Sequence, residues 1–261
     1  MKIPIYQVDA FTGKLFGGNP AAICPLEEWV SDDLMLNIAK ENNLAETAYF
    51  VKQGENFHLK WFTPETEMDL CGHATLASAH VIFEHLGYEK EAITFDTMSG
   101  ELVVKKVNGL LQMDFPSRMP ESASVPDIIL KSFSIRPKKV LKARDYFLIY
   151  EKEEDISSLE VDQGRLSWID PGTGGIICTA PGREVDFVSR FFTPGAAVFE
   201  DPVTGSAHCS LIPYWSEILG KKEMVAYQLS ERKGEINCVD QGDRVLISGN
   251  AVTFLKGEID V

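Results

Sequence analysis

The sequence carries one pattern twice, and this duplication restricts the possible folds more than any other feature. The stretch FHLKWFTP at residues 57–64 has a counterpart in FVSRFFTP at residues 187–194. In each copy an alternating aromatic strand stops at Thr-Pro, and a glycine (Gly72 or Gly205) then opens an apolar helix. A repeat this long indicates a duplicated domain, not a solenoid. Two similar halves are expected to form one cleft between them.

The duplication predicts an α+β fold of two similar, pseudo-symmetric lobes. Each lobe is expected to be a curled, mostly antiparallel sheet around a central helix, namely the helix that follows the repeated strand. A chain of 261 residues has room for two such domains. The Pro- and Ser-rich segment 116–126 predicts lobes at residues 1–117 and 118–261, with the last strand a candidate to cross back to the first lobe.

Three local signals predict individual elements. Ser31, followed by two aspartates, is typical of a helix N-terminus and predicts a helix that ends at about residue 42 or 43. Asn108-Gly109 between apolar runs predicts a β-hairpin. A weaker pattern predicts a helix over residues 156–166.

Composition and charge exclude several classes of function. The formal net charge of -14 disfavours binding to nucleic acid or to an anionic membrane surface. A small anionic substrate remains compatible, because a few local N–H groups outweigh a distant field. No apolar run approaches the ~18 residues of a membrane helix. Residues 3–8 form a strand pattern at the start of the chain, without the apolar core of a signal peptide, so we expect a cytoplasmic protein.

The five cysteines show no metal-binding or disulfide pattern. They are scattered, and none forms a CxxC pair or a Cys/His cluster with zinc-ligand spacing (Cys24, Cys71, Cys178, Cys209 and Cys238). The sequence therefore predicts no metal and no cofactor.

The two halves differ at positions where an acid could do chemistry. The first half has Glu46 before its strand, where the second has Gly174, and the second half has Asp201 just ahead of its helix. A carboxyl group from each half can hold a substrate carbon between an acid and a base.

The two helix starts are candidate anion sites. Gly72 and Gly205 place free N–H groups and the positive end of the helix dipole next to any ligand. His73, one residue inside the first helix, can donate to an anion or relay a proton. Ser206 occupies the matching place in the second half.

Each of these residues also has an ordinary structural interpretation when taken alone. Asp201 before a helix is most often a cap, and Glu46 is an ordinary acid at a strand edge. A histidine such as His73 at a helix start is more often structural than catalytic. Cys71 is more typical of a buried small residue than of a nucleophile.

Four motifs that occur in a fixed order favour the functional interpretation of these residues over the structural one. They are G-N-P-A at residues 18–21, A-E-T at 45–47, C-G-H-A-T at 71–75 and E-D-P-V-T-G-S-A at 200–207. Together they make the chain resemble the PhzF family of phenazine-biosynthesis isomerases over essentially its whole length. The resemblance implies a fold like that of diaminopimelate epimerase, in agreement with the duplication.

The resemblance also implies roles for individual residues. Glu46 would act as general base and then acid, moving a proton between carbons and so shifting a double bond without a cofactor. The other catalytic positions fall on His73, Asp201 and Ser206. The positions implied to bind substrate are Asn19, Gly72, Gly174, Thr204 and Gly205. The expected partners are a small anionic organic substrate and a second copy in a homodimer, with no nucleic acid and no membrane.

Two alternatives remain open at this point. One is a racemase or epimerase that uses Cys71 with Asp201, since the related fold employs one thiol in each lobe and the second thiol has no counterpart here. The other is a non-catalytic protein that binds a small molecule on the same fold.

Overall fold

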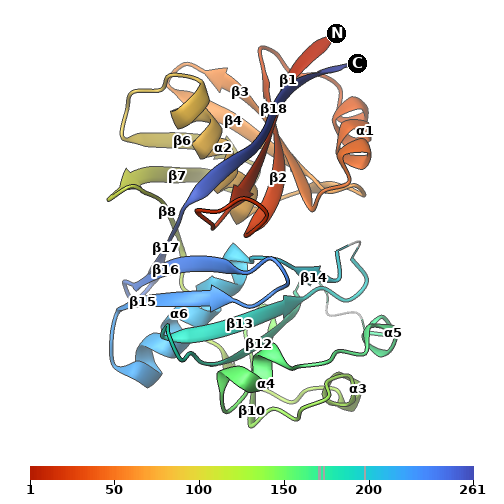
Figure 1. The fold of residues 1–261 in the computed structure, drawn as a ribbon, viewed down its shortest axis with the longest axis vertical. Coiled ribbons are helices and arrows are strands. Elements are labelled where there is room, and N and C mark those ends of the chain that lie inside the picture. Colours follow the sequence, from red (N-terminus) through yellow and green to blue (C-terminus); the bar gives the residue numbers. More distant parts are fainter. Residues whose placement is uncertain (170–171, 173, 197) are drawn as a thin grey trace. The chain divides into compact units, whose positions relative to one another are not determined.

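The structure, a computed structural model, describes residues 1–169, 172, 174–196 and 198–261 (Figure 1). The chain divides into two compact units. The first comprises Met1–Asp114 and Ser248–Val261, and the second Phe115–Ile247. The last strand, β18 (Ala251–Asp260), pairs antiparallel with β1 (Lys2–Ala10), so the end of the chain completes the first unit.

The first unit is one curled sheet in which pairing runs β18–β1–β2–β3–β4–β6–β7–β8, with the short β5 also on β4. The β2–β3 and β4–β6 pairs are parallel and the others antiparallel. The remaining bounds are β2 Asn19–Leu26, β3 Glu46–Gln53, β4 Asn56–Phe62, β5 Glu67–Met68, β6 Ala92–Thr97, β7 Gly100–Val107 and β8 Leu110–Pro116.

Helix α1 (Asp32–Asn42) connects the parallel strands β2 and β3, as a parallel pair requires a crossover. The Ser31 hydroxyl accepts from the backbone N–H of Leu34, and Asn43 ends the helix in the left-handed conformation. Both predicted ends of this helix are confirmed. Met35 and Ile38 are buried in a cluster with side chains of the neighbouring strands.

Helix α2 (Gly72–His85) contacts β1, β2, β3 and β18 (Figure 1). Small side chains such as Ala74, Ala77 and Ser78 are fully buried, which lets the helix approach the sheet closely. Nine of its fourteen residues are buried, including an unbroken run over residues 73–79, as expected of a central helix and not of a surface one.

The Asn108-Gly109 turn joins β7 to β8 as predicted. Val107 pairs with Leu110, and the two turn residues have φ angles of 51° and 82°. Positive φ at both positions is the type I′ geometry that fits the right-handed twist of the flanking strands.

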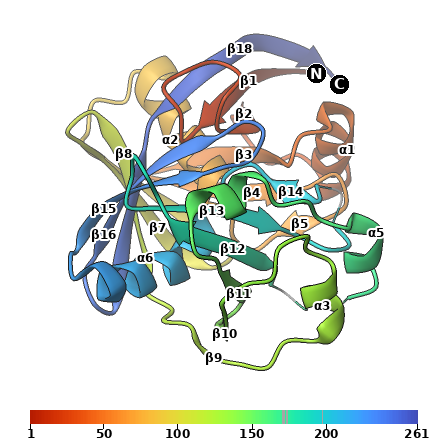
Figure 2. The same cartoon turned by 60° about the horizontal axis from the view of Figure 1, so that its bottom comes forward.

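The second unit repeats this pairing pattern (Figures 1 and 2). Its order is β9–β10–β11–β12–β13–β15–β16, with β14 on β13, and the parallel pairs are β11–β12 and β13–β15. The α+β fold with two similar lobes is confirmed. The bounds are β9 Glu121–Ser122, β10 Lys139–Lys142, β11 Tyr146–Ile149, β12 Ile176–Pro181, β13 Phe187–Phe192, β14 Glu200–Asp201, β15 Glu223–Gln228, β16 Gly234–Asp240 and β17 Arg244–Gly249.

The predicted helix over residues 156–166 is wrong, because the segment is broken into α4 (Glu153–Ser157) and α5 (Gln163–Leu166). Val161 instead bridges to Phe133, and the Asp162 side chain accepts from a backbone N–H to begin a new helix. A β-branched residue and a capping aspartate both favour this break. A further short helix, α3 (Asp127–Lys131), precedes β10.

Helix α6 (Gly205–Leu219) is the counterpart of α2 and contacts β15 and β16 (Figure 2). It tolerates an internal proline because Pro213 only removes the N–H that would bond the carbonyl of Cys209. That carbonyl accepts from the backbone N–H of Arg118 at 2.8 Å instead. None of the helices in the described ranges combines the length and apolarity required to cross a membrane.

Candidate active site

Glu46 and His73 meet at one edge of the first unit. Glu46 is the first residue of β3 and His73 the second of α2. The Glu46 Oε2 atom lies 3.2 Å from Nε2 of His73, and their side chains are 15% and 5% exposed. The fold thus brings together an acid and an imidazole that are 27 positions apart in the sequence.

Asn19 contacts the other nitrogen of the same ring. It is the first residue of β2, is fully buried, and places its Nδ2 atom 3.1 Å from Nδ1 of His73. When the amide donates to Nδ1, the ring is neutral and carries its proton on Nε2; in the imidazolium Nδ1 carries a proton too and no longer accepts from the amide. In both states an N–H of His73 points at Glu46.

Cys71 completes the group as the residue that precedes α2. Its Sγ atom lies 3.5 Å from Nδ1 of His73, and the side chain is buried. Burial raises the pKa of the Cys71 thiol, and the nearby Glu46 carboxylate raises it further. The sulfur is therefore a thiol near neutral pH and a poor nucleophile.

The proton on His73 is held by its neighbours. Burial by itself lowers the pKa of His73, whereas a Cys71 thiolate and the Glu46 carboxylate each raise it; because Cys71 is a thiol near neutral pH, the carboxylate is the partner that favours the imidazolium there. An imidazolium beside Glu46 can keep that carboxylate oriented as a hydrogen-bond acceptor.

The first turn of α2 offers backbone donors next to this group. The first backbone N–H to find an acceptor within the helix is that of Thr75, which bonds the carbonyl of Cys71. The N–H groups before it have no intrahelical acceptor by geometry. Gly72 has no side chain to cover them, so this end of the helix suits an anion.

The second unit holds Asp201, Thr204 and a residue that the sequence did not reveal. The Thr204 hydroxyl donates to Oδ2 of Asp201 at 2.5 Å. Gln228, fully buried on β15, accepts from the backbone N–H of Thr204 at 2.9 Å and donates to the carbonyl of Asp201 at 2.7 Å. Gln228 thereby fixes the loop that leads into α6, and nothing in a strand sequence marks such a role.

Ser206 lies next to a second residue that sequence reasoning missed. The Nη2 atom of Arg144 is 3.5 Å from the Ser206 hydroxyl at the start of α6. Gly174 packs directly against the backbone of Arg144. A Cβ atom at position 174 would lie only 2.4 Å from the carbonyl oxygen of Arg144, so a side chain there has no space. A guanidinium beside a helix N-terminus suits a carboxylate. Gly205 opens the helix as predicted.

Three side chains of the first unit could also hold a metal ion. One ligand atom each of Glu46, Cys71 and His73 lies within 4.8 Å of the others. Sequence spacing did not indicate this cluster, since its members come from two separate elements.

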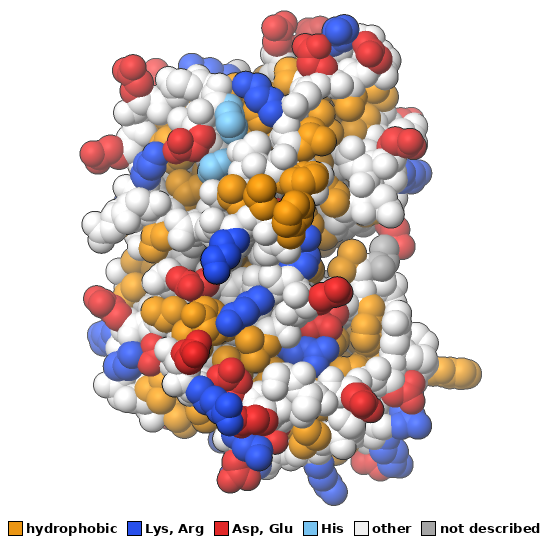
Figure 3. Space-filling view, in the orientation of Figure 1, with side chains coloured by type: hydrophobic (Ala, Val, Ile, Leu, Met, Phe, Trp, Pro, Cys, Tyr) orange, Lys and Arg blue, Asp and Glu red, His pale blue; other side chains and the backbone are white. Residues whose placement is uncertain are grey.

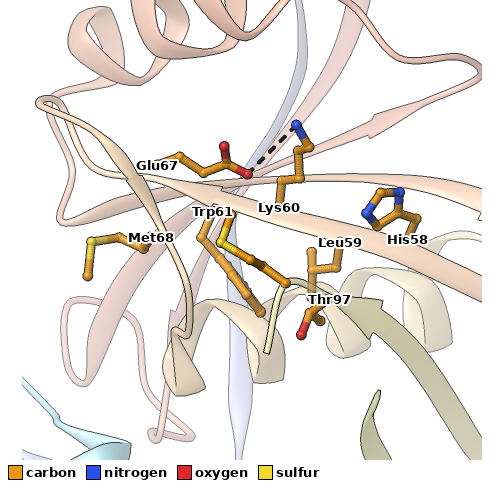
Figure 4. A pocket seen from close by; sticks show the side chains of 8 residues that line it. His58, Leu59, Lys60, Trp61, Glu67, Met68 and Thr97 are labelled. Carbon is orange, nitrogen blue, oxygen red and sulfur yellow. Dashed lines mark ion pairs between the residues drawn. The ribbon is translucent and has the colours of Figure 1, made fainter. Parts of the chain in front are cut away.

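A separate pocket of about 280 Å³ lies beside β4 and contains none of the predicted site residues (Figure 4). The Lys60–Glu67 ion pair, 3.7 Å long, lies on its wall. Its lining residues are His58, Leu59, Lys60, Trp61, Glu67, Met68, Thr97 and Met98. On the surface shown in Figure 3, acidic and basic side chains are interspersed, without the continuous basic patch of a nucleic-acid-binding protein.

Comparison with known proteins identifies the family. Residues 8–257 match the sequence profile described as phenazine biosynthesis-like protein. An uncharacterised isomerase of Pseudomonas aeruginosa is 45% identical over 259 residues, which cover 99% of both chains. A mouse phenazine biosynthesis-like domain-containing protein is 40% identical over 291 aligned positions, again with 99% of both chains covered.

Solved structures agree. The crystal structure of a PhzF-family protein from Enterococcus faecalis is 43% identical, superposes with a TM-score of 0.96 and covers 100% of both chains. A hydroxyproline epimerase from Agrobacterium vitis shares the fold alone, at 9% identity and a TM-score of 0.61, with 99% of this chain and 92% of that chain covered. With a family profile, near-full-length relatives and a superposable structure in agreement, this chain belongs to the PhzF, or phenazine biosynthesis-like, family.

Proposed function

We propose that this protein is a cofactor-independent isomerase that moves a proton between two carbons of a small, carboxylate-bearing substrate. Glu46 is the general base and then the general acid. The observation that carries this proposal is the contact of 3.2 Å between Glu46 Oε2 and His73 Nε2, next to the N-terminus of α2. Family members named as isomerases support the reaction class.

The reaction is balanced within one substrate molecule. Glu46 removes a proton from one carbon, and the electron pair left behind shifts the double bond. Negative charge that develops in this step is stabilised by N–H groups at the start of α2. The protonated Glu46 then returns its proton to a second carbon, so that no oxidant, reductant or cofactor is consumed.

His73 serves this cycle by holding one oxygen of Glu46. Nε2 of His73 faces Oε2 at an ion-pair distance of 3.2 Å, which leaves the other carboxylate oxygen for the substrate proton. We also assign Asp201, Thr204 and Ser206 to orienting the substrate, on the strength of the family motif at residues 200–207. The bonds from Thr204 and Gln228 to Asp201 support an ordered loop there.

The alternative in which Cys71 acts as the base has less support. A base at this position must be a thiolate, whereas burial and the Glu46 carboxylate both raise the pKa of Cys71.

Deuterium exchange tests the proposal. A panel of small cyclic and unsaturated amino and hydroxy acids is incubated in deuterated water, and mass spectrometry measures deuterium gained at carbon. We expect incorporation by the wild type and a loss of at least about a hundredfold in rate for Glu46→Gln. Glu41→Gln, on the exposed side of α1, is the matched control and should retain the wild-type rate.

Two outcomes would contradict the proposal. Exchange that survives in Glu46→Gln would show that another base acts. A wild type that binds a compound of the panel, seen by thermal shift, and returns it without deuterium would support the non-catalytic binding protein instead.

A further inference from the structure

We propose that Glu46, Cys71 and His73 bind one Zn²⁺ ion, and that this ion switches off the isomerase. Zinc binding is a property of the three side chains alone. The inhibitory effect rests on the proposed function of Glu46, so the two parts are tested separately.

Two pair distances in the cluster each match the separation of two ligand atoms on tetrahedral zinc, although each involves a different nitrogen of His73. Zn–S bonds of about 2.3 Å and Zn–N bonds of about 2.0 Å at a tetrahedral angle separate the two ligand atoms by roughly 3.5 Å. The Sγ atom of Cys71 lies 3.5 Å from Nδ1 of His73. An oxygen ligand atom and a nitrogen ligand atom on the same tetrahedral zinc ion are separated by roughly 3.3 Å. Glu46 Oε2 lies 3.2 Å from Nε2 of His73.

One ring nitrogen can hold the ion at a time. The Asn19 amide already contacts Nδ1, so Nε2 is the nitrogen that we assign to the metal, and Glu46 Oε2 lies at the required separation from it. The third ligand belongs to a set of atoms within 4.8 Å of one another, so rotation of a side chain brings it to the metal.

The donor types select the metal. Thiolate and imidazole ligands favour zinc over magnesium or calcium, which prefer sites made of oxygen atoms. Three protein ligands leave the fourth tetrahedral position open for water, as in zinc sites with an exchangeable ligand. The net charge of -14 raises the local concentration of cations.

The cluster also has polar atoms that a cation would satisfy. Glu46 Oε2 and His73 Nε2 are buried atoms that face each other without a hydrogen bond of good geometry. Buried polar atoms in this state are uncommon in folded proteins. Zinc displaces the thiol proton of Cys71 as it binds, which offsets the cost of ionising a buried sulfur.

Zinc would block proton transfer by occupying the base. A carboxylate that coordinates the metal no longer has the lone pair with which Glu46 accepts a proton from carbon. Inhibition is therefore expected at one ion per chain and should be reversed by a chelator.

The first experiment measures metal binding without any substrate. Chelator-treated protein is titrated with CoCl₂, which reports tetrahedral coordination by its visible absorption and thiolate ligation by a charge-transfer band in the near ultraviolet. We expect both signals to saturate at one equivalent. In Cys71→Ser the charge-transfer band should disappear, and calorimetry should show at least a tenfold weaker affinity for ZnCl₂.

Two further variants make the result decisive. Cys24→Ser changes another buried cysteine of the same unit, on β2, and should keep the charge-transfer band. Glu46→Gln alters the more exposed ligand and should weaken zinc binding at least tenfold even if Cys71→Ser fails to fold. Absence of the band in the wild type, or its persistence in a folded Cys71→Ser protein, would overturn the site.

The second experiment measures deuterium exchange with and without one equivalent of ZnCl₂. Each protein is compared with its own zinc-free rate. We expect the wild-type rate to fall at least tenfold and to recover with chelator, while Cys71→Ser resists zinc. If cobalt binds but zinc does not lower the exchange rate, the inhibitory role of the metal is overturned and the metal-binding site itself is retained. If the wild type catalyses no deuterium exchange, both the proposed isomerase function and its inhibition by zinc are overturned. The cobalt titration still tests the metal site in that case, because it needs no substrate.

Discussion

The contact between Asn19 and His73 is the residue-scale feature that most changes the sequence-based interpretation. The family resemblance implied that Asn19 binds substrate, whereas its amide lies 3.1 Å from Nδ1 of His73 in a fully buried position. That contact favours a proton on the opposite ring nitrogen, toward Glu46. We therefore propose that Asn19 positions this acid–base pair in addition to the substrate binding that the family resemblance implies.

Kinetics of Asn19→Ala separate the two roles of this residue. We expect kcat for exchange to fall roughly tenfold or more with little change in KM, because the His73 ring loses the side chain that contacts its Nδ1 atom and holds its orientation. A higher KM with an unchanged kcat would instead support direct binding of substrate. Asn42→Ala, which removes a partly buried amide bonded to Thr47, is the control for a general loss of stability.

At the scale of elements, α6 is anchored to the sheet of the second unit by a buried hydroxyl. Thr179 on β12 accepts from the indole N–H of Trp215 at 2.9 Å and donates to the carbonyl of Val188 at 2.7 Å. The Trp215 ring also stacks on Phe187, with centroids 5.7 Å apart. The helix is thus held by directed bonds as well as by apolar packing.

Thr179→Val keeps the shape of this side chain and removes its hydroxyl. We expect the free energy of unfolding to fall by roughly 2 kcal/mol, since a buried donor and a buried acceptor lose their partner. Thr179→Ser retains the hydroxyl and should lose clearly less. Chemical denaturation followed by tryptophan fluorescence measures both variants, and equal losses would show that the hydrogen bonds contribute little.

The start of α6 contains a histidine that makes the second unit sensitive to acid. Burial lowers the pKa of His208 to about 4, although its ring donates a hydrogen bond to the carbonyl of Thr204 at 2.8 Å. The unfolded chain, with a histidine pKa near 6.5, binds a proton at higher pH than the folded chain does. The folded state therefore loses stability as the pH falls from about 6.5 to 4.

The expected loss over this pH range is about 3 kcal/mol. His208→Gln cannot take up this proton, so its free energy of unfolding should vary less with pH between about 6.5 and 4. Denaturation curves at several pH values measure the difference. Parallel pH profiles for the two proteins would mean that His208 does not titrate as its burial implies.

At the scale of the whole molecule, the chain returns to the first unit at its end. Residues 251–260 form β18, which pairs along the full length of β1 through a register that includes one irregularity near Gln7 and Val8. Because β1 also pairs with β2, loss of β18 would leave β1 with a single partner strand.

Truncation after Asn250 tests this dependence. We expect amide hydrogens of β1 and α2 to exchange at least tenfold faster, because the first unit loses a strand of its sheet and a contact of its helix. Peptides from residues 120–240 of the second unit should keep their protection. Removal of Val261 alone is the control, and unchanged exchange in β1 after the longer truncation would contradict the expectation.

Local sequence signals predicted the elements that depend on a few neighbouring residues. The cap at Ser31, the helix end near residues 42 and 43 and the Asn108-Gly109 turn were all confirmed, because their geometry is decided by hydrogen bonds and φ angles within one or two turns of chain. The helix predicted over residues 156–166 failed because Val161 forms its bridge with a residue far away in sequence.

The sequence by itself determined the duplicated α+β fold, the family and the candidate acid–base residues, because these depend on periodicity and on motifs that are visible in the chain. Only the tertiary structure decided that Asn19 contacts His73, that Gln228 holds the Asp201 loop and that Cys71 joins Glu46. These contacts join residues from separate strands and helices. Their distances are fixed by how the sheets and helices pack, which no local pattern in the sequence encodes.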